Sequence, residues 1–432
     1  MCVDPAPPPS ARLTRRGVLA ASAALAGTAG ALASGIGPAS AASGAATAAG
    51  GARRPARTGD LVVEGGTLLD PGTGDVVEDA VVVIRDGVIR AAGRRGRVDV
   101  PEGTPRLDAH GRWVLPGLVD AHIHINTMSE AADALRQGAT SARSGSTNFY
   151  QDIAVRELAR QAPELAPRLT AAGVFVTPDL GDTVLGDPDL VPLARLKGGV
   201  RSAEALRRVV DVNVARGADV IKTRVNPRAG LAEQDPLEQV YSHEQLSEIV
   251  AAAKRHGKGV LCHSYSEQGC HDAVTAGIRS LEHGAFVGER TLAEMRRRGT
   301  FFTPTLGAIA GMIGSDDPVL DERGRTYLPL LKKAALAAHR MGVRLAAGTD
   351  SSGGVVDPIG GEVELMHSAG LSALDALRTA TTGAAELLGL TGTVGRPVRG
   401  FAGDLVLVSG DPLADLSVLR APTRVVHAGI AL

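Results

Sequence analysis

The sequence predicts an α/β protein, a (β/α)8 TIM barrel with a small β-sandwich domain formed from both chain ends. Between residues 118 and 390, short apolar runs alternate with stretches of helical periodicity, which is the pattern of βα units around a parallel sheet. The flanking segments, 59–117 and 391–432, have the pattern of short strands interrupted by Gly, Asp and Pro turns. We therefore expect a barrel domain and a composite β-sandwich domain.

Eight apolar runs are candidate barrel strands. They are LVDAHIHI from 118, ATSARSG from 139, RLTAAGVFV from 168, ADVIKTRV from 218, GVLCHSY from 259, IRSLEHG from 278, TFFTPTL from 300 and VRLAAGTDS from 343. Between the fourth and fifth runs, Ser242 is a good N-cap for a patterned stretch that ends at Gly257, so we predict a helix there. Eight strands with intervening helices favour a barrel, in which chemistry lies at the carboxyl ends of the strands.

Length and composition narrow the function classes. The 432 residues fit a barrel of about 250 residues plus a smaller domain. The formal net charge of -1 gives no basic surface for nucleic acid, and the aromatic content of 3% argues against a base-stacking surface. We therefore expect no nucleic-acid partner.

The first 42 residues are predicted to be an export signal. Arg15 and Arg16 precede an Ala-rich, weakly apolar run, and small residues suited to cleavage follow, for example after Ala41. The pattern resembles a twin-arginine signal, which implies the twin-arginine export machinery as a partner and a secreted or periplasmic location. The alternative is a disordered basic tail. The apolar run is too weak for a stable membrane span, and residues 43–58 are assigned to a linker.

Residues that can bind a metal ion fall on the predicted strands, mostly at their carboxyl ends. Residues i and i+2 of a strand face the same way, so His122 and His124 would form half of a divalent-metal site. Each histidine alone has an ordinary structural interpretation, but a barrel brings the whole set to one rim. In a regular strand, Glu282 would face away from that rim. The candidate ligands are His122, His124, Lys222, His263, His283 and Asp350.

The ordered set of motifs resembles the amidohydrolase superfamily, in particular its imidazolonepropionase-like and Xaa-Pro-dipeptidase-like branch. The resemblance extends from about residue 60 to the end of the chain. It implies a metal-dependent hydrolase that cleaves a C–N amide bond. The motifs that carry it are GRWVLPGLVDAHIH, GADVIKTRV, GTDSSGG and EVELMHSAGLSALDALRTATTGAAELLGL.

The resemblance also implies two divalent metal ions, expected to be zinc. One ion would be held by His122, His124, Lys222 and Asp350, and the other by Lys222, His263 and His283. Related enzymes carbamylate this lysine with CO₂, which turns a cation into a bridging carboxylate. A hydroxide bound between the ions would attack the carbonyl, with Asp350 as general base and then general acid. The alternative for Lys222 is a structural ion pair.

The sequence departs from this branch in loops that would line the substrate pocket, so the substrate is less constrained than the metal site. The candidate substrate contacts are Arg143, Arg224, Arg228 and Tyr241. Arg224 or Arg228 could clamp a carboxylate, although each also fits a solvated loop charge. We expect a dipeptide or an N-acyl amino acid. The alternatives are a cyclic amide or lactone, or a non-catalytic binding protein on this barrel, and association into a homo-oligomer is left open.

Overall fold

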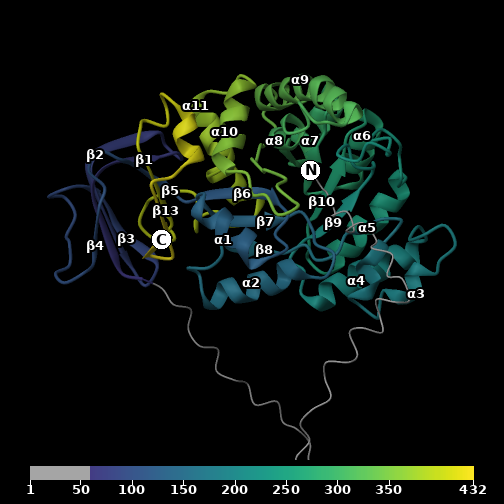
Figure 1. Ribbon diagram of the computed structural model, residues 1–432, viewed down its shortest axis with the longest axis horizontal. Coiled ribbons are helices and arrows are strands. Elements are labelled where there is room, and N and C mark those ends of the chain that lie inside the picture. Colours follow the sequence, from purple (N-terminus) through teal and green to yellow (C-terminus); the bar gives the residue numbers. More distant parts are fainter. Residues whose placement is uncertain (1–58) are drawn as a thin grey trace, which may run out of the picture. The chain divides into compact units, whose positions relative to one another are not determined.

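The structure, a computed structural model, describes residues 59–432 (Figure 1). The predicted twin-arginine signal and the predicted linker lie outside the described residues. Within residues 59–432, no helix is both long enough and apolar enough to cross a membrane.

Both ends of the described chain contribute to one eight-stranded sheet (Figure 1). Strand β13 pairs antiparallel with β5, with Leu405 opposite Pro116, and this pairing joins the two ends. Leu61, Val63 and Leu407 lie in the hydrophobic core on one face of the sheet. The predicted composite β-sandwich is thereby confirmed, while its boundaries stay a prediction. The strands are β1 (Leu61–Asp70), β2 (Asp75–Arg85), β3 (Val88–Arg94), β4 (Arg106–Asp108), β5 (Trp113–Pro116), β13 (Leu405–Val408), β14 (Arg424–His427) and β15 (Ile430–Ala431).

The intervening chain forms the predicted (β/α)8 barrel, and its strands pair in parallel. A bridge between Val176 and Thr223 links the third strand position to the fourth. The eighth run bridges β12 at Leu345, and Ala121 N donates to Ala347 O at 2.8 Å, which links the eighth run to the first strand. The barrel strands in the described chain are β6 (Leu118–Ile123), β7 (Ala139–Ser144), β8 (Arg168–Thr170), β9 (Ile221–Arg224), β10 (Val260–Ser264), β11 (Ser280–His283) and β12 (Phe301–Thr303).

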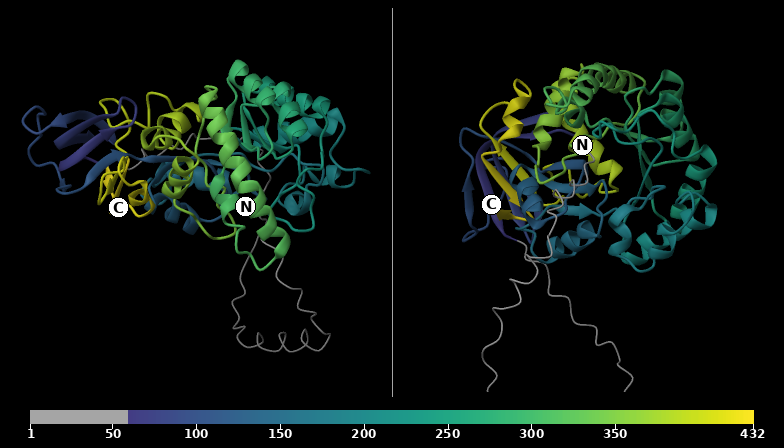
Figure 2. Two further views of the ribbon diagram at one scale, coloured as in Figure 1. Left: turned by 90° about the horizontal axis from the view of Figure 1, so that it is seen from above. Right: turned by 45° about the vertical axis from the view of Figure 1, so that its right-hand side comes forward.

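Helices surround these strands (Figures 1 and 2). The helix predicted after Ser242 is α5, whose first turn forms a capping box between Ser242 and Gln245. Gly257, just past its end, has a φ of +67°, as expected of a glycine that stops a helix. The longer helices are α1 (Met128–Arg136), α2 (Gln151–Gln161), α4 (Ala203–Arg216), α5 (His243–Arg255), α6 (Glu267–Ala276), α7 (Glu289–Arg298), α9 (Pro318–Arg340) and α10 (Ile359–Ser368). Shorter ones are α3 (Val191–Ala194), α8 (Leu306–Ala310), α11 (Ala373–Thr379) and α12 (Thr382–Leu387).

Candidate functional site

The six candidate metal ligands meet at the carboxyl ends of the barrel strands. Asp350 Oδ1 lies 3.2 Å from His124 Nε2 and 3.4 Å from His122 Nε2. Lys222 Nζ lies 3.0 Å from His122 Nε2. The ring centroids of His122 and His283 are 5.6 Å apart. The ring centroids of His283 and His263 are 4.3 Å apart. Strands that are distant in sequence therefore bring one compact set of nitrogen and oxygen atoms together.

Three of these residues have a donor set that suits a divalent ion. His122, His124 and Asp350 each offer a ligand atom, and these atoms lie within 4.8 Å of one another. Two imidazole nitrogens with a carboxylate oxygen are suitable ligands for zinc and several other divalent metals. Gly145 keeps the space beside them open, because a Cβ there would lie 2.6 Å from Nε2 of both histidines. The residues therefore fit a metal ion.

Hydrogen bonds fix the tautomers of the first-strand histidines. His122 Nδ1 lies 2.6 Å from Glu282 Oε2, and His124 Nδ1 lies 2.8 Å from the carbonyl oxygen of Ser146. A carboxylate and a carbonyl can only accept, so Nδ1 carries the hydrogen in each neutral ring. The lone pair is then on Nε2, the nitrogen that faces Asp350 in both residues.

Hydrogen bonds also fix the tautomers of the other two histidines, through Nδ1 of His283 and through Nε2 of His263. Thr305 donates its hydroxyl hydrogen to Pro304 O at 2.7 Å, so its oxygen accepts from His283 Nδ1 at 2.7 Å. His263 Nε2 donates to Pro227 O at 3.0 Å. The lone pairs are therefore on Nε2 of His283 and Nδ1 of His263.

Glu282 faces the barrel interior, so the expectation that it would face away from the rim was wrong. The reason is the backbone of His283, whose φ of +70° breaks the regular alternation of the strand. Both side chains therefore lie at the site. Burial alone would raise the pKa of the Glu282 carboxyl, but Arg143 and His122 hold that pKa well below its usual range. Glu282 is thus a carboxylate that orients His122.

A non-glycine residue with positive φ is uncommon, and such residues tend to occur at functional sites. His283, Thr305 and Asp350 have φ values of +70°, +52° and +54°, and all three follow or end barrel strands. Asp350 N donates to His122 O at 2.7 Å, which holds this backbone against the first strand. Three of the residues with positive φ are therefore two candidate metal ligands, His283 and Asp350, and the threonine that orients His283.

A family model described as the amidohydrolase family matches residues 113–430. The protein belongs to the amidohydrolase family. Ochratoxinase of Aspergillus niger is 26% identical over 408 residues, which cover 83% of this chain and 83% of that protein. Imidazolonepropionase of Sphingopyxis alaskensis is 25% identical over 377 residues, covering 78% and 88%. A solved Xaa-Pro dipeptidase with bound methionine aligns with a TM-score of 0.77 at 23% identity, covering 86% of this chain and 99% of that one.

This amidohydrolase is therefore a hydrolase that acts on carbon–nitrogen bonds, as the sequence predicted. Metal dependence is typical of the family, and the His122–His124–Asp350 set gives this chain a fitting site.

Two of the predicted substrate contacts, Arg143 and Tyr241, are buried and donate hydrogen bonds to other groups of the protein. Arg143 is buried, where it donates to Ala121 O at 2.6 Å and to Glu282 Oε1 at 2.9 Å. Tyr241 is buried as well, and its hydroxyl donates to Val200 O at 2.9 Å. Their partners are groups of the protein itself, so the structure favours bracing roles for both residues over contact with a substrate.

The other two predicted contacts are less buried than Arg143 and Tyr241. Arg224 ends β9, its guanidinium lies 4.7 Å from the ring centroid of Phe175, and its Nε donates to Thr177 Oγ1 at 2.9 Å. Arg228 follows in the loop after β9, and both arginines are half-buried. Their contact with a substrate stays a prediction.

Two carboxylates, Asp120 and Glu130, connect the ligand-bearing segments, although the sequence assigned a role to neither. Asp120 accepts from His122 N at 3.0 Å and from Thr349 Oγ1 at 2.8 Å, and burial raises its pKa to about 6. Glu130 accepts from Thr127 N at 2.8 Å and from Gly354 N at 3.0 Å. Asp120 thus ties the first strand to the eighth run, and Glu130 ties the start of α1 to the loop that follows the eighth run. A signal for Asp120 was present, because it is an acid in a mostly apolar strand and lies two residues before His122.

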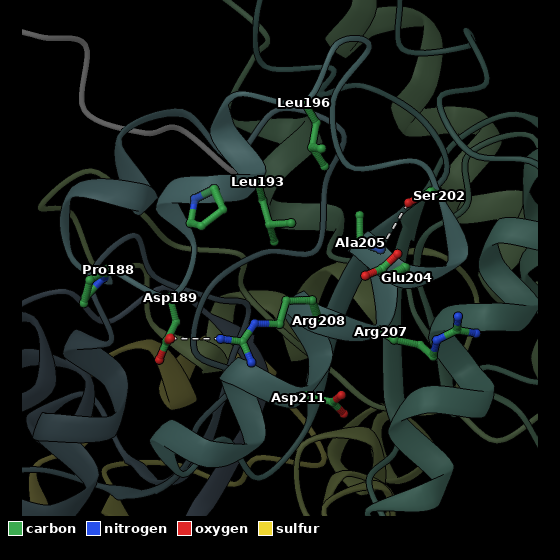
Figure 3. Close-up of a pocket in the computed structure, with 11 residues that line it drawn as sticks. Pro188, Asp189, Leu193, Leu196, Ser202, Glu204, Ala205, Arg207, Arg208 and Asp211 are labelled. Carbon is green, nitrogen blue, oxygen red and sulfur yellow. Dashed lines mark hydrogen bonds and ion pairs between the residues drawn. The ribbon is translucent and has the colours of Figure 1, made fainter.

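A separate surface pocket of about 550 Å³ lies beside α3 and α4 (Figure 3). Its lining includes Leu193, Leu196 and Ala205, and Arg208 at its edge donates to Asp189 at 2.9 Å. None of the candidate ligands or predicted substrate contacts lines it. This pocket is therefore distinct from the metal-ligand cluster.

Proposed function

We propose that this amidohydrolase hydrolyses the amide bond of a dipeptide or an N-acyl amino acid, using two divalent ions, expected to be zinc. The observation that carries the proposal is the convergence of His122, His124 and Asp350 with Lys222, His263 and His283. The names of the relatives agree with it, since they include an Xaa-Pro dipeptidase and an ochratoxinase.

The chain would divide its ligands between two ions. His122, His124 and Asp350 would hold one, while His263 and His283 would hold the other through the ring nitrogens that carry lone pairs. Lys222 as an ammonium would repel a cation, but addition of CO₂ to its neutral amine, with loss of a proton, gives an anionic carbamate. The two metal ions, when bound, would polarise the scissile carbonyl and lower the pKa of the attacking water.

The proton transfers are assigned to Asp350 as part of this proposal. Its Oδ1 lies between the two Nε2 atoms of the first-strand histidines, and its backbone is held by the carbonyl of His122. We assign to it the removal of a proton from the attacking water and the delivery of that proton to the leaving nitrogen. Arg224 or Arg228 would bind the substrate carboxylate through paired hydrogen bonds.

A cyclic amide or a lactone is the second candidate substrate. The similarity to imidazolonepropionase favours it, and so does the three-residue set that could hold a single ion. In that case Lys222 would have a structural role. A non-catalytic binding protein is the least supported alternative, because every ligand and the proposed base are present.

Metal content per chain tests the proposal. Elemental analysis of the purified wild-type protein should give close to two divalent ions per chain, and Lys222→Ala should lose a large part of them. The exposed Lys197→Ala is the matched control and should match the wild type. A single ion that Lys222→Ala leaves unchanged would contradict the carbamate-bridged site and favour the cyclic substrate. Activity is then measured on dipeptides and N-acyl amino acids.

We also propose that the chain is exported by the twin-arginine route to a secreted or periplasmic location. The support is the Arg15–Arg16 pair before the weakly apolar run. Cell fractionation of the full chain should find the mature protein outside the cytosol. Replacing both arginines by lysine should retain it inside, and export that persists in this variant would contradict the proposal.

A further inference from the structure

The loop between β9 and α5 is unusually long for a βα connection. Residues 225–242 form neither helix nor strand, and this length exceeds the roughly 12–15 residues beyond which such loops are uncommon and usually functional. Val240 N donates to Val225 O at 2.8 Å, so the two ends of the loop lie next to each other. The residues between them form a compact loop. We call residues 225–242 the β9 loop.

The inner edge of the β9 loop touches the candidate metal site. Val225 N donates to His263 O at 2.9 Å, and Pro227 O accepts from the ring of His263 at 3.0 Å. Arg228, a predicted contact for the substrate carboxylate, is the next residue. The position of this arginine therefore depends on how the β9 loop is held.

The outer edge of the β9 loop is held by one side chain of α9. Arg323 Nη1 donates to Ala229 O at 3.0 Å and to Leu231 O at 2.8 Å. Its Nη2 donates to Ala232 O at 3.3 Å and to Gln234 O at 2.6 Å. A planar guanidinium can serve four carbonyls in this way, whereas an ammonium is a single point with three donors.

These contacts lead from Arg323 to Arg228. Arg323 Nη1 donates to the carbonyl oxygen of Ala229, and Ala229 directly follows Arg228 in the chain. Gln234 is bound by Arg323 through its carbonyl, and its side-chain Oε1 accepts from Arg228 N at 3.1 Å. The backbone of Arg228 is thus fixed on both sides by groups that Arg323 organises.

We propose that Arg323 is a positioning residue that holds the β9 loop so that Arg228 binds the carboxylate of the substrate. This inference rests on the function proposed above. Without the guanidinium, four carbonyls lose their donor and the loop gains conformational freedom, which must be given up again when a substrate binds. The loss therefore falls on substrates that carry the carboxylate and not on the hydrolytic step.

The test compares a cleaved N-acyl amino acid with its carboxamide, using full-length, metal-loaded protein. Arg323→Met should raise KM for the carboxylate by about tenfold or more, the size expected for losing hydrogen bonds to a charged group. The KM for the carboxamide, the value of kcat and the metal content should stay close to wild type. Arg323→Lys should give an intermediate KM. The matched control is Arg325→Met on the same helix, where the arginine is exposed and pairs with Asp321.

A double-mutant cycle separates positioning from a general effect on the fold. Arg228→Met alone should raise KM for the carboxylate, and adding Arg323→Met should raise it little further, because the second residue acts through the first. Additive effects of the two substitutions would overturn the proposal. So would an equal rise of KM for the carboxamide, or a loss of metal in Arg323→Met.

Amide hydrogen exchange of the β9 loop is a readout that does not need a substrate. Arg323→Met should speed exchange in the peptides that cover residues 229–238, and Arg325→Met should not. Unchanged exchange in Arg323→Met would overturn the positioning role even if the substrate is of another class. A wild-type protein that cleaves no dipeptide or N-acyl amino acid, but whose loop responds in this way, would instead refute the proposed function.

Discussion

Two buried clusters in this chain use the same residue types, an arginine, a carboxylate and a histidine, with different results. One lies at the carboxyl ends of the barrel strands, and the other joins β8 to the composite sheet. The clusters are Arg143–Glu282–His122 and Arg168–Asp404–His427.

The second cluster binds two parts of the fold together. Asp404 is buried, and its Oδ1 accepts from His427 Nδ1 at 3.0 Å and from Ala428 N at 2.8 Å. Its Oδ2 accepts from Arg168 at 2.5 Å, and Arg168 begins β8 of the barrel. Burial opposes the charge, but Arg168 and His427 hold the pKa of Asp404 well below its usual value.

The first cluster continues into further chemistry. The histidine that Glu282 orients presents its other nitrogen to Lys222 and Asp350. The comparison teaches that a buried ionic cluster by itself indicates packing. It indicates function when its histidine also faces several potential metal ligands.

The largest expected effect is on kcat, and it comes from substituting Asp350 at the carboxyl ends of the barrel strands. Asp350→Asn should lower kcat by about 10²–10⁴-fold, the contribution typical of a general acid–base residue. The remaining ligands should still bind metal, so elemental analysis accompanies the kinetics. Persistent turnover in a metal-loaded variant would assign the base to another residue.

Breaking the Arg168–Asp404–His427 cluster should lower the stability of the fold instead of kcat. Asp404→Asn leaves the partly exposed Arg168 and the buried His427 without their charged partner, so the free energy of unfolding should fall by about 1–3 kcal/mol. Chemical denaturation measures the loss. The metal content of the folded protein should match wild type, and a selective loss of metal would remove the distinction between the two clusters.

Glu282→Gln should weaken metal binding by about 10–100-fold, the usual effect of removing a carboxylate that orients a metal-binding histidine. Competition with a chelator gives the affinity, corrected for the fraction of folded protein. Asp404→Asn is the matched control, since it removes the same kind of charge far from the ligands. Equal affinities in the two variants would show that the orientation of His122 does not depend on the charge of Glu282.

The smallest effect concerns acid stability. The pKa of Asp404 is lowered in the folded state, so its contribution to stability is complete above the unfolded value of about 3.9 and declines as pH falls through the folded pKa. Unfolding free energies measured from pH 5 downward should therefore fall less steeply in Asp404→Asn than in wild type. Parallel curves would mean that Asp404 does not titrate differently in the two states.

Much of this arrangement was predictable because it follows from short-range patterns. The apolar runs mark seven strands among the described residues, and the HxH spacing alone places His122 and His124 on one face. The direction of Glu282 was not predictable, because the positive φ of His283 arises from the packed strand end. Arg143 and Tyr241 lie in segments that suggest a pocket, yet their burial depends on partners far away in sequence, such as Glu282 and Val200.

The pairing of β5 with β13 has a consequence for synthesis of the chain. Strand β5 lies immediately before β6, which carries His122 and His124, but its partner β13 follows all of the barrel strands in the sequence. A ribosome must therefore synthesise all of the barrel strands before β5, which pairs with β1 on one edge, gains β13 on its other edge. Prematurely terminated chains would expose the backbone edge of β5, a feature that promotes pairing with other chains. The pairing of β5 with β13 thus distinguishes chains that contain β13 from chains truncated before it.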